Sequence, residues 1–456
     1  MKVGIFVTAG KQNFYSAISS SLRTLEEVDV NELVLVHTER AKDNVERLNE
    51  LLSRVLGKEG LKTEMVPGDE VPWKERFEKI KSLDLDLAII SPAGTSLSSL
   101  VSKAFETAHV SFPFSLWWGL TYPFVPRFLQ RFNSLKEISE EKVILNVAGK
   151  VLSNEMADEL LDVLGERGPI RRETALNVLK MNSQYSKPCK DECPRPKLRF
   201  EIRYSKKGKV DPKDKISWRE AEVLWSVTLA ESPEEQLLKS AKGALNKLKG
   251  LMDEGILERG SDTVLWLSGV LPVEVEPKEV SVPLIADTSA LYLGILNTPY
   301  RVRIPRCAMY ELLHKYEERA KRTSKYVNLI GLISKLLFEE VKARGSPYPS
   351  PPDLCDKALL QIDPLLLEGN AIATEDVGIE MMWKGSPMEK LAKLVKVKRL
   401  YNKTEYYNEA YSYFTAFQLF SIFKLIDKEL ERLYGGKGTI RFSGKAYVND
   451  QAFTSF

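Results

Sequence analysis

The chain has 456 residues, 43% of them hydrophobic, so it is too long for one core and too apolar for disorder, and about three domains are expected. Lys and Arg number 66 against 63 for Asp and Glu, so no overall charge excess indicates a polyanionic partner. Four cysteines are too few for a disulfide scaffold, and no apolar run reaches the ~20 residues that cross a bilayer, so we expect a cytoplasmic protein without a membrane segment. The high content of Lys and Glu is a weak sign of a heat-adapted organism.

Residues 1–150 alternate between strand-like and helix-like patterns. Near-continuous apolar runs at 3–7, 33–36 and 87–90 are typical of strands covered on both faces, and residues 42–56 show helical spacing of apolar side chains. These patterns predict a Rossmann-like, doubly wound α/β domain.

Ligands of such sheets bind beyond the carboxyl ends of the strands. Glycine and hydroxyl-bearing turns there allow close approach to a phosphate or ribose, although ordinary turns with Ser or Thr helix caps fit the residues too. Lys11 and Lys103 suit a phosphate or a solvated helix face. The candidate ligand-binding residues are Thr8, Ala9, Gly10, Lys11, His37, Thr38, Gly94, Thr95 and Ser96.

The order of these turns resembles the CRISPR-associated Rossmann fold (CARF) family. A strand is followed by Thr-x-Gly, a second strand ends in His-Thr-Glu, and a later strand leads through Gly-Thr-Ser into a helix. The resemblance implies a CARF-like domain at 1–150 in a homodimer of a CRISPR antiviral defence system, with cyclic oligoadenylate bound across the dimer axis as allosteric activator. The later loop lacks the lysine of the CARF pattern, so degradation of the ligand by this domain is not expected.

Residues 151–215 are expected to form a helical and basic linker. Between 187 and 215 there are eleven basic and five acidic residues, which fits a linker or a hairpin that faces nucleic acid. Cys189 and Cys193 lie there without a second ligand pair, so a thiol pair or a disulfide is expected rather than zinc.

Residues 216–280 resemble a winged helix-turn-helix. Ser217 and Glu220 form a capping box that predicts a helix over 217–225, a further helix is predicted at 239–253, and a short strand at 263–267. Such a module either reads DNA through its second helix or acts as a spacer and dimerising part.

Four acidic positions in the last third of the chain suit a metal site. Asp287 closes an apolar strand at 284–286, where an unpaired carboxylate is costly to bury. Asp353 and Asp356 compete for the third position, and we favour Asp356 because Asp353 fits a helix cap. The candidate catalytic residues, whose four acids are the candidate metal ligands, are Asp287, Ser289, Glu311, Asp356, Thr374 and Asp376.

The order of these residues resembles the PilT N-terminus (PIN) nuclease family over most of 281–385. The pattern is Asp-x-Ser, Glu-Leu, Asp before an apolar helix, and Thr-x-Asp after a strand. The resemblance implies an α/β PIN-like domain at 281–400 that cuts single-stranded RNA with Mg²⁺ or Mn²⁺, which prefer carboxylate and water oxygens. Histidine is not required, and His314, one turn past Glu311, is expected to be structural.

Residues 401–456 are expected to form an aromatic-rich helical extension of that domain with a hairpin-like end. Its aromatics fit core or dimer contacts, or stacking on unpaired bases. The combined expectation is a metal-dependent endoribonuclease activated by cyclic oligoadenylate. The alternatives are a ligand-responsive, DNA-binding transcription regulator whose PIN-like domain serves assembly, and a toxin nuclease without a nucleotide signal.

Overall fold

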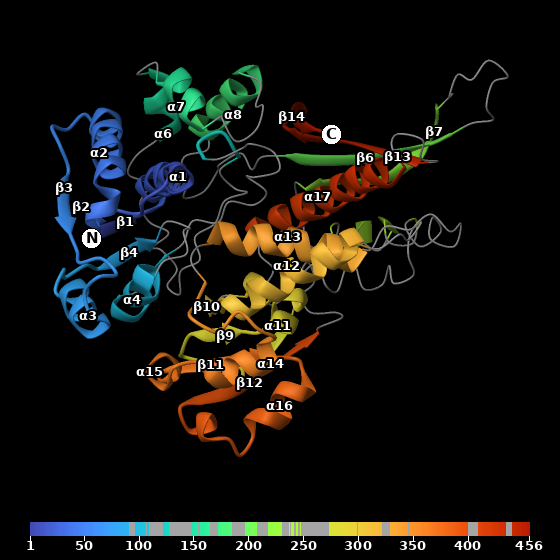
Figure 1. Ribbon diagram of the computed structural model, residues 1–456. Helices are drawn as coiled ribbons and strands as arrows, with labels where there is room; N and C mark the ends of the chain where they lie inside the picture. The colour runs from blue at the N-terminus through green and yellow to red at the C-terminus, as the bar shows by residue number, and fades with distance from the viewer. Residues whose placement is uncertain are drawn as a thin grey trace.

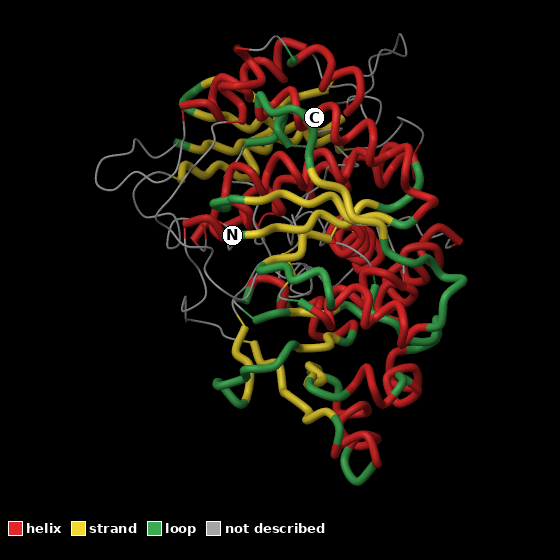
Figure 2. Tube along the Cα trace, turned by 90° about the vertical axis from the view of Figure 1, so that its left-hand side faces the viewer, coloured by secondary structure: helices red, strands yellow, loops and turns green. Residues whose placement is uncertain are grey.

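The computed structural model describes residues 1–90, 96–105, 107–108, 122–126, 147–153, 156–164, 172–184, 197–207, 218–229, 237, 239–240, 243–244, 247, 273–298, 300–321, 329–344, 347–399, 409–434 and 440–456. Within these ranges the protein is mixed α/β, as expected, and its strands form three sheets (Figures 1 and 2). No helix in the described part of the chain is both long and apolar enough to cross a membrane.

The N-terminal sheet has five parallel strands in the order β3-β2-β1-β4-β5. The order reverses direction between β1 and β4, and in such sheets ligands bind beyond the carboxyl ends of the strands at this point. The three strands predicted for this part of the chain are thereby confirmed. The strands are β1 (Lys2–Val7), β2 (Glu32–His37), β3 (Lys62–Met65), β4 (Leu87–Ile90) and β5 (Thr107–Ala108).

Helices cover both faces of this sheet, which explains the continuous apolar runs. Ile5 and Ile89 belong to one core with α1 and α2, whereas Phe6 and Ile90 belong to a second core with α3 and α4. The helix predicted from its apolar spacing has the predicted bounds and buries Val45 among its apolar residues. These helices are α1 (Lys11–Glu27), α2 (Lys42–Leu56), α3 (Trp73–Lys81) and α4 (Ser96–Ala104), with the 3-10 turn η1 (Glu39–Ala41).

Three short helices follow the first sheet and pack on its α1 side. The carboxylate of Glu26 on α1 accepts hydrogen bonds from the backbone N–H groups of Val147 and Ala148, which begin α6. The segment at 151–215 was expected to be a helical and basic linker. Its helices instead pack on the first sheet's helices and belong to the first unit. They are α6 (Val147–Ser153), α7 (Ala157–Leu164) and α8 (Arg172–Gln184). Cys189 and Cys193 lie outside the described residues.

The second sheet has the order β10-β9-β11-β12-β8, with β8 antiparallel to β12 and the other strands parallel. Because β8 belongs to this sheet, the expected boundary at residue 280 falls inside the unit. The strands are β8 (Val273–Glu276), β9 (Leu284–Ala286), β10 (Val302–Arg303), β11 (Asn370–Thr374) and β12 (Ala392–Arg399).

Helices and turns connect these strands and cover the second sheet. They are α11 (Thr288–Leu293), α12 (Arg306–Lys321), α13 (Leu329–Arg344), α14 (Cys355–Ala358), α15 (Pro364–Leu367) and α16 (Val377–Trp383), with η4 (Ile295–Asn297), η5 (Leu359–Gln361) and η6 (Pro387–Lys390).

The third sheet is antiparallel and joins two distant stretches of chain in the order β14-β13-β6-β7. Helix α17 (Glu409–Tyr434) packs on β6 and β13, as Figure 1 shows, and Phe417, Phe420 and Phe423 are buried there. The aromatic segment is thus core, and the predicted C-terminal hairpin is confirmed. The strands are β6 (Leu198–Lys207), β7 (Trp218–Leu229), β13 (Ile440–Val448) and β14 (Gln451–Ser455).

The helix predicted over 217–225 is wrong, because this stretch is strand β7. Neighbouring residues of a regular strand point to opposite faces, yet Leu224 and Trp225 are both buried. Two register shifts between β6 and β7 account for this. These bulges break the alternation of a strand and produce an apolar pair that looks helical. The expected strand at 263–267 lies outside the described residues, as does most of the helix expected at 239–253.

Candidate carboxylate site

Asp287 is buried at the carboxyl end of β9, where it caps α11. Only 2% of the residue is exposed. Its carboxylate accepts hydrogen bonds from the Ala290 N–H at 2.8 Å, from the Ser289 hydroxyl at 2.9 Å and from the Thr374 hydroxyl at 2.7 Å. Burial nevertheless raises the pKa of Asp287 from 3.8 to about 6, because these neutral donors compensate only part of the lost hydration.

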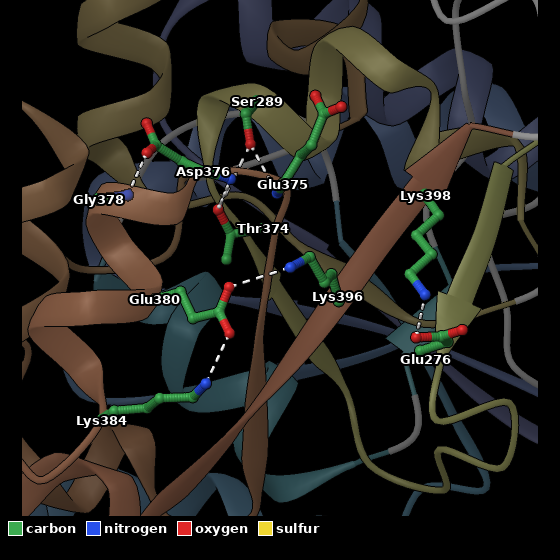
Figure 3. A network of polar contacts seen from close by, with 10 residues as sticks. All are labelled: Glu276, Ser289, Thr374, Glu375, Asp376, Gly378, Glu380, Lys384, Lys396 and Lys398. Carbon is green, nitrogen blue, oxygen red and sulfur yellow. Dashed lines mark hydrogen bonds and ion pairs between the residues drawn. The ribbon is translucent and has the colours of Figure 1, made fainter.

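The two hydroxyl groups also bind the segment that carries the next acids. The Ser289 hydroxyl accepts the Glu375 N–H and the Thr374 hydroxyl accepts the Asp376 N–H, both at 2.9 Å (Figure 3). The adjacent strands β9 and β11 are parallel, so both chain segments leave the sheet at the same edge. Ser289 and Thr374 therefore hold Asp287 and Asp376 in one local network.

Glu311 reaches the same place from helix α12. Its carboxylate accepts the backbone N–H of Cys355 at 2.6 Å, which connects α12 to the start of α14. The negative charge of Glu311 also contributes to the raised pKa of Asp287, so the two carboxylates interact through the pocket. Glu311 and Asp287 are thus close enough to repel each other electrostatically.

One pocket gathers all four predicted acids. Asp353, the competitor of Asp356, is not among the lining residues, and its carboxylate accepts the N–H of the next residue at 2.7 Å. The pocket is lined by Asp287, Thr288, Ser289, Tyr292, Glu311, Lys315, Cys355, Asp356, Glu375, Asp376 and Ile379.

These acids surround the pocket without forming a compact cage. Across the described residues, no three Asp, Glu, His or Cys side chains are grouped closely enough to be a ready-made metal site. Glu380, a further acid on α16, is bonded to Lys384 and Lys396 instead (Figure 3). The arrangement is an open, acid-lined pocket.

Cys355, which lines this pocket, forms a disulfide with Cys307 that was not predicted from the sequence. The disulfide joins the first turn of α12, which carries Glu311, to the start of α14, which carries Asp356. The available signal was indirect, since each cysteine lies within four residues of a predicted acid. If the acids converge, the cysteines must converge with them.

Lys315 was also missed, although it lines the pocket one helical turn beyond Glu311. Its ammonium group lies 5.0 Å from the centre of the Tyr292 ring. His314, expected to be structural, is exposed and stacks on Tyr310. Helical spacing from Glu311 would have found both residues.

The structure describes the predicted N-terminal ligand residues only in part. The Thr8 side chain is buried after β1, and the Asn44 amide donates to the carbonyl oxygens of Thr8 at 2.9 Å and Gly10 at 3.3 Å. Gly10 has a φ of 103° that favours glycine. Ala9 is exposed beside them, and Thr38 is half-buried and accepts a contact from the His37 ring at its carbonyl oxygen.

Most of the remaining N-terminal candidates lie outside what the structure describes. Gly94 and Thr95 lie outside the described residues, and the side chains of Lys11 and Ser96 are not described. Lys103 donates to the carbonyl oxygen of Leu365 in the second unit, so its ammonium serves a contact between units and not a phosphate in the crevice.

Comparison of this chain with models of protein families, with curated proteins and with solved structures found no match. The fold and the pocket therefore define a mixed α/β protein. Its N-terminal sheet is parallel, and the strand ends of its second sheet support an acid-lined pocket.

Proposed function

We propose that this chain is a metal-dependent nuclease that cuts single-stranded RNA at the acid-lined pocket. The observation that carries the proposal is that Asp287, Glu311, Asp356 and Asp376, from four separate stretches of the chain, line one pocket. A protein that used these residues only as caps and surface charges would have no need to bring like charges together. The order of the acids adds the resemblance to PIN nucleases.

The donor set fits a hard divalent cation. Mg²⁺ typically keeps several waters and is bound by one or two carboxylates together with substrate phosphates, so a compact protein cage is not required. Within the described part of the chain Asp287 forms no ion pair with Lys or Arg, and a cation beside it would offset both the cost of burying its charge and the repulsion from Glu311. Such an ion would polarise the scissile phosphate and lower the pKa of a bound water.

The residues of the chain have distinct roles in this proposal. Asp287, Glu311, Asp356 and Asp376 would hold the metal. Ser289 and Thr374 orient Asp287 by hydrogen bonds and keep it in the ionised form that a metal ligand requires.

The N-terminal unit would regulate the nuclease. The resemblance to CARF domains, the parallel sheet with its reversal between β1 and β4, and the turn at Thr8 and Gly10 support binding of a cyclic oligoadenylate by a homodimer. The protein would then be a CRISPR-associated effector, and the ligand would act through different affinities for two conformations.

The alternative function, a DNA-binding transcription regulator, is weakened by the structure of the segment expected to bind DNA. The first helix of the expected winged helix-turn-helix is strand β7, which pairs with β6. No described feature favours base reading by this segment.

The test is incubation of the full chain with Mn²⁺ and end-labelled single-stranded RNA, with and without cyclic oligoadenylates of different ring size. We expect metal-dependent cleavage that the matching ring stimulates. Asp356→Asn should lower the cleavage rate by about 100-fold or more, since it removes one of few charged ligands. Asp353→Asn is the matched control, because Asp353 lies three residues away and does not line the pocket. Absence of cleavage with every ring and metal, or equal loss in both variants, would refute the proposal.

A further inference from the structure

Helix α12 presents an exposed pair of stacked rings next to the acid-lined pocket. The centres of the Tyr310 and His314 rings are 6.0 Å apart and the rings are 20° from parallel. Tyr310 is 44% exposed, and His314 is exposed as well. The pair therefore offers an open aromatic face that the described parts of the chain leave uncovered.

The helix places this pair directly beside the site. Glu311 and Lys315 line the pocket, and on a helix residues three and four apart are neighbours. His314 is therefore adjacent to Glu311 on the helix surface, and Tyr310 lies on the flank of the same wall. A ligand whose charged part enters the pocket would have a flat group within reach of the rings.

Charge identifies the kind of ligand. Among the described residues Lys315 is the only basic one that lines the pocket, and it forms no ion pair with any described carboxylate. The ligand therefore needs an anionic group that Lys315 and a metal can hold, and a flat ring that can cover Tyr310. A nucleotide unit of an unpaired strand has both parts. Base stacking on aromatic side chains is tolerant of sequence and common in proteins that bind single strands.

We infer that Tyr310 and His314 form a base-stacking subsite that holds a nucleotide next to the scissile phosphate, with Lys315 on the phosphate. This inference rests on the proposed nuclease function and assigns it a residue pair that selects unpaired strands. A duplex keeps its bases stacked internally and cannot offer one to the pair.

The test measures binding in the Asp287→Asn background, so that cleavage does not interfere. Fluorescence anisotropy would follow a short labelled single strand, as RNA and as DNA of the same sequence, and a strand of equal length without bases. We expect Tyr310→Ala with His314→Ala to weaken binding of the base-containing strands by about 5- to 150-fold. Binding of the abasic strand should already be weak and should not change further. A larger effect on RNA than on DNA would show that the subsite also senses the sugar.

Two controls separate the subsite from general damage. Tyr310→Phe keeps the ring and should restore most of the affinity. Trp73→Ala removes an exposed tryptophan that stacks on Phe77 in the N-terminal unit and should leave binding unchanged. Equal affinity of the alanine variant and the parent for base-containing strands, or equal losses for abasic and normal strands, would overturn the subsite.

The proposed function has its own independent measurement. Hydrolysis of bis(p-nitrophenyl) phosphate by the wild-type chain with Mn²⁺ reports phosphodiester cleavage without any base. Hydrolysis together with unchanged binding by the Tyr310 and His314 variant would discard the subsite alone. Absence of hydrolysis would discard the nuclease, while the binding cycle would still decide whether the rings bind bases.

Discussion

Asp287 illustrates how a single residue can be costly for the fold and useful for a site. Its carboxylate is buried, surrounded by neutral donors and close to the charge of Glu311. A folded pKa of about 6 against 3.8 when unfolded means that the folded chain binds this proton more tightly. The free energy of unfolding therefore falls as the pH rises through this window, because the folded chain must ionise a buried group.

Asp287→Asn should consequently stabilise the metal-free protein at neutral pH. Removal of the buried charge should raise the free energy of unfolding above pH ~6 by on the order of 1–3 kcal/mol, less what the changed hydrogen bonds cost. Below pH ~4 the advantage should vanish, since Asp287 is then neutral in both states.

Thermal unfolding between acid and neutral pH would measure this difference. Added Mn²⁺ should raise the melting temperature of the wild type and leave the variant unaffected. A wild type that is the more stable form at neutral pH without metal would contradict the account.

At the scale of single residues, the sequence predicted those site residues that lie at the end of a buried strand. Asp287 and Asp376 could be found because each follows a buried strand, and Thr374 because it precedes one of them. Helical spacing places His314 and Lys315 beside Glu311, but the sequence does not show which neighbouring elements complete the pocket there, so these two residues and Tyr310 were missed.

Among the elements, α12 and α14 determine the shape of the pocket and are joined covalently. The Cys307–Cys355 disulfide closes a segment of 48 residues, and the Cys355 N–H holds the Glu311 carboxylate. The bond therefore fixes two acid-bearing helices relative to each other.

Replacement of both cysteines by alanine should destabilise the protein and loosen the pocket. Chain-entropy arguments for a closed segment of 48 residues give a loss of about 4 kcal/mol. Mn²⁺ affinity should also fall, because Glu311 and Asp356 are no longer held together.

Chemical unfolding and metal titration of the double alanine variant test both expectations. Dithiothreitol should shift the unfolding of the wild type and not that of the variant. An unfolding midpoint identical to that of the oxidised wild type would show that the bond contributes nothing.

Element prediction succeeded where the pattern is regular. Helix α2 has its predicted bounds because its apolar side chains keep strict helical spacing and Gly57 ends it in a left-handed conformation. Strand β7 was mistaken for a helix because bulges, which depend on the partner strand, disturb its alternation.

On the scale of the whole molecule, the end of α4 is fixed to the second sheet. Arg301 and Arg303 both donate to the carbonyl oxygen of Ser102 at 2.9 Å, and Arg301 also donates to that of Phe105 at 3.1 Å. Positive charge at the carboxyl end of a helix is favourable, and Arg303 additionally binds the Tyr348 hydroxyl at 3.0 Å. Helix α4, which follows β4 in the N-terminal sheet, is thus bonded to residues at β10, and β10 leads into α12, the helix of Glu311.

Arg303→Ala should weaken this contact between the two units. Loss of two hydrogen bonds from a charged, largely buried group should lower the free energy of unfolding by about 2–4 kcal/mol. Amide exchange should accelerate in α4 and near Tyr348. The exposed Arg306 provides the matched control, and its replacement by alanine should change stability by less than about 0.5 kcal/mol. Equal behaviour of the two variants would show that the contact does not hold the units together.

The third sheet was beyond sequence reasoning because its halves lie far apart in the chain. The pairing of β6 with β13 joins Leu198–Lys207 to Ile440–Val448, and no local pattern announces such a partner. The end of the expected linker (β6), the start of the expected winged helix (β7) and the terminal extension (β13 and β14) consequently contribute strands to one sheet.

The pairing of β6 with β13 also means that, during synthesis, β6 leaves the ribosome long before its partner strand is made. After β6 emerges, more than 200 further residues must be translated before β13 exists, which takes roughly 10–50 s at typical elongation rates. Throughout that interval the nascent chain carries an open strand edge of the kind that recruits neighbouring polypeptides. Expression at reduced translation speed should therefore prolong the exposure of that edge and favour aggregation.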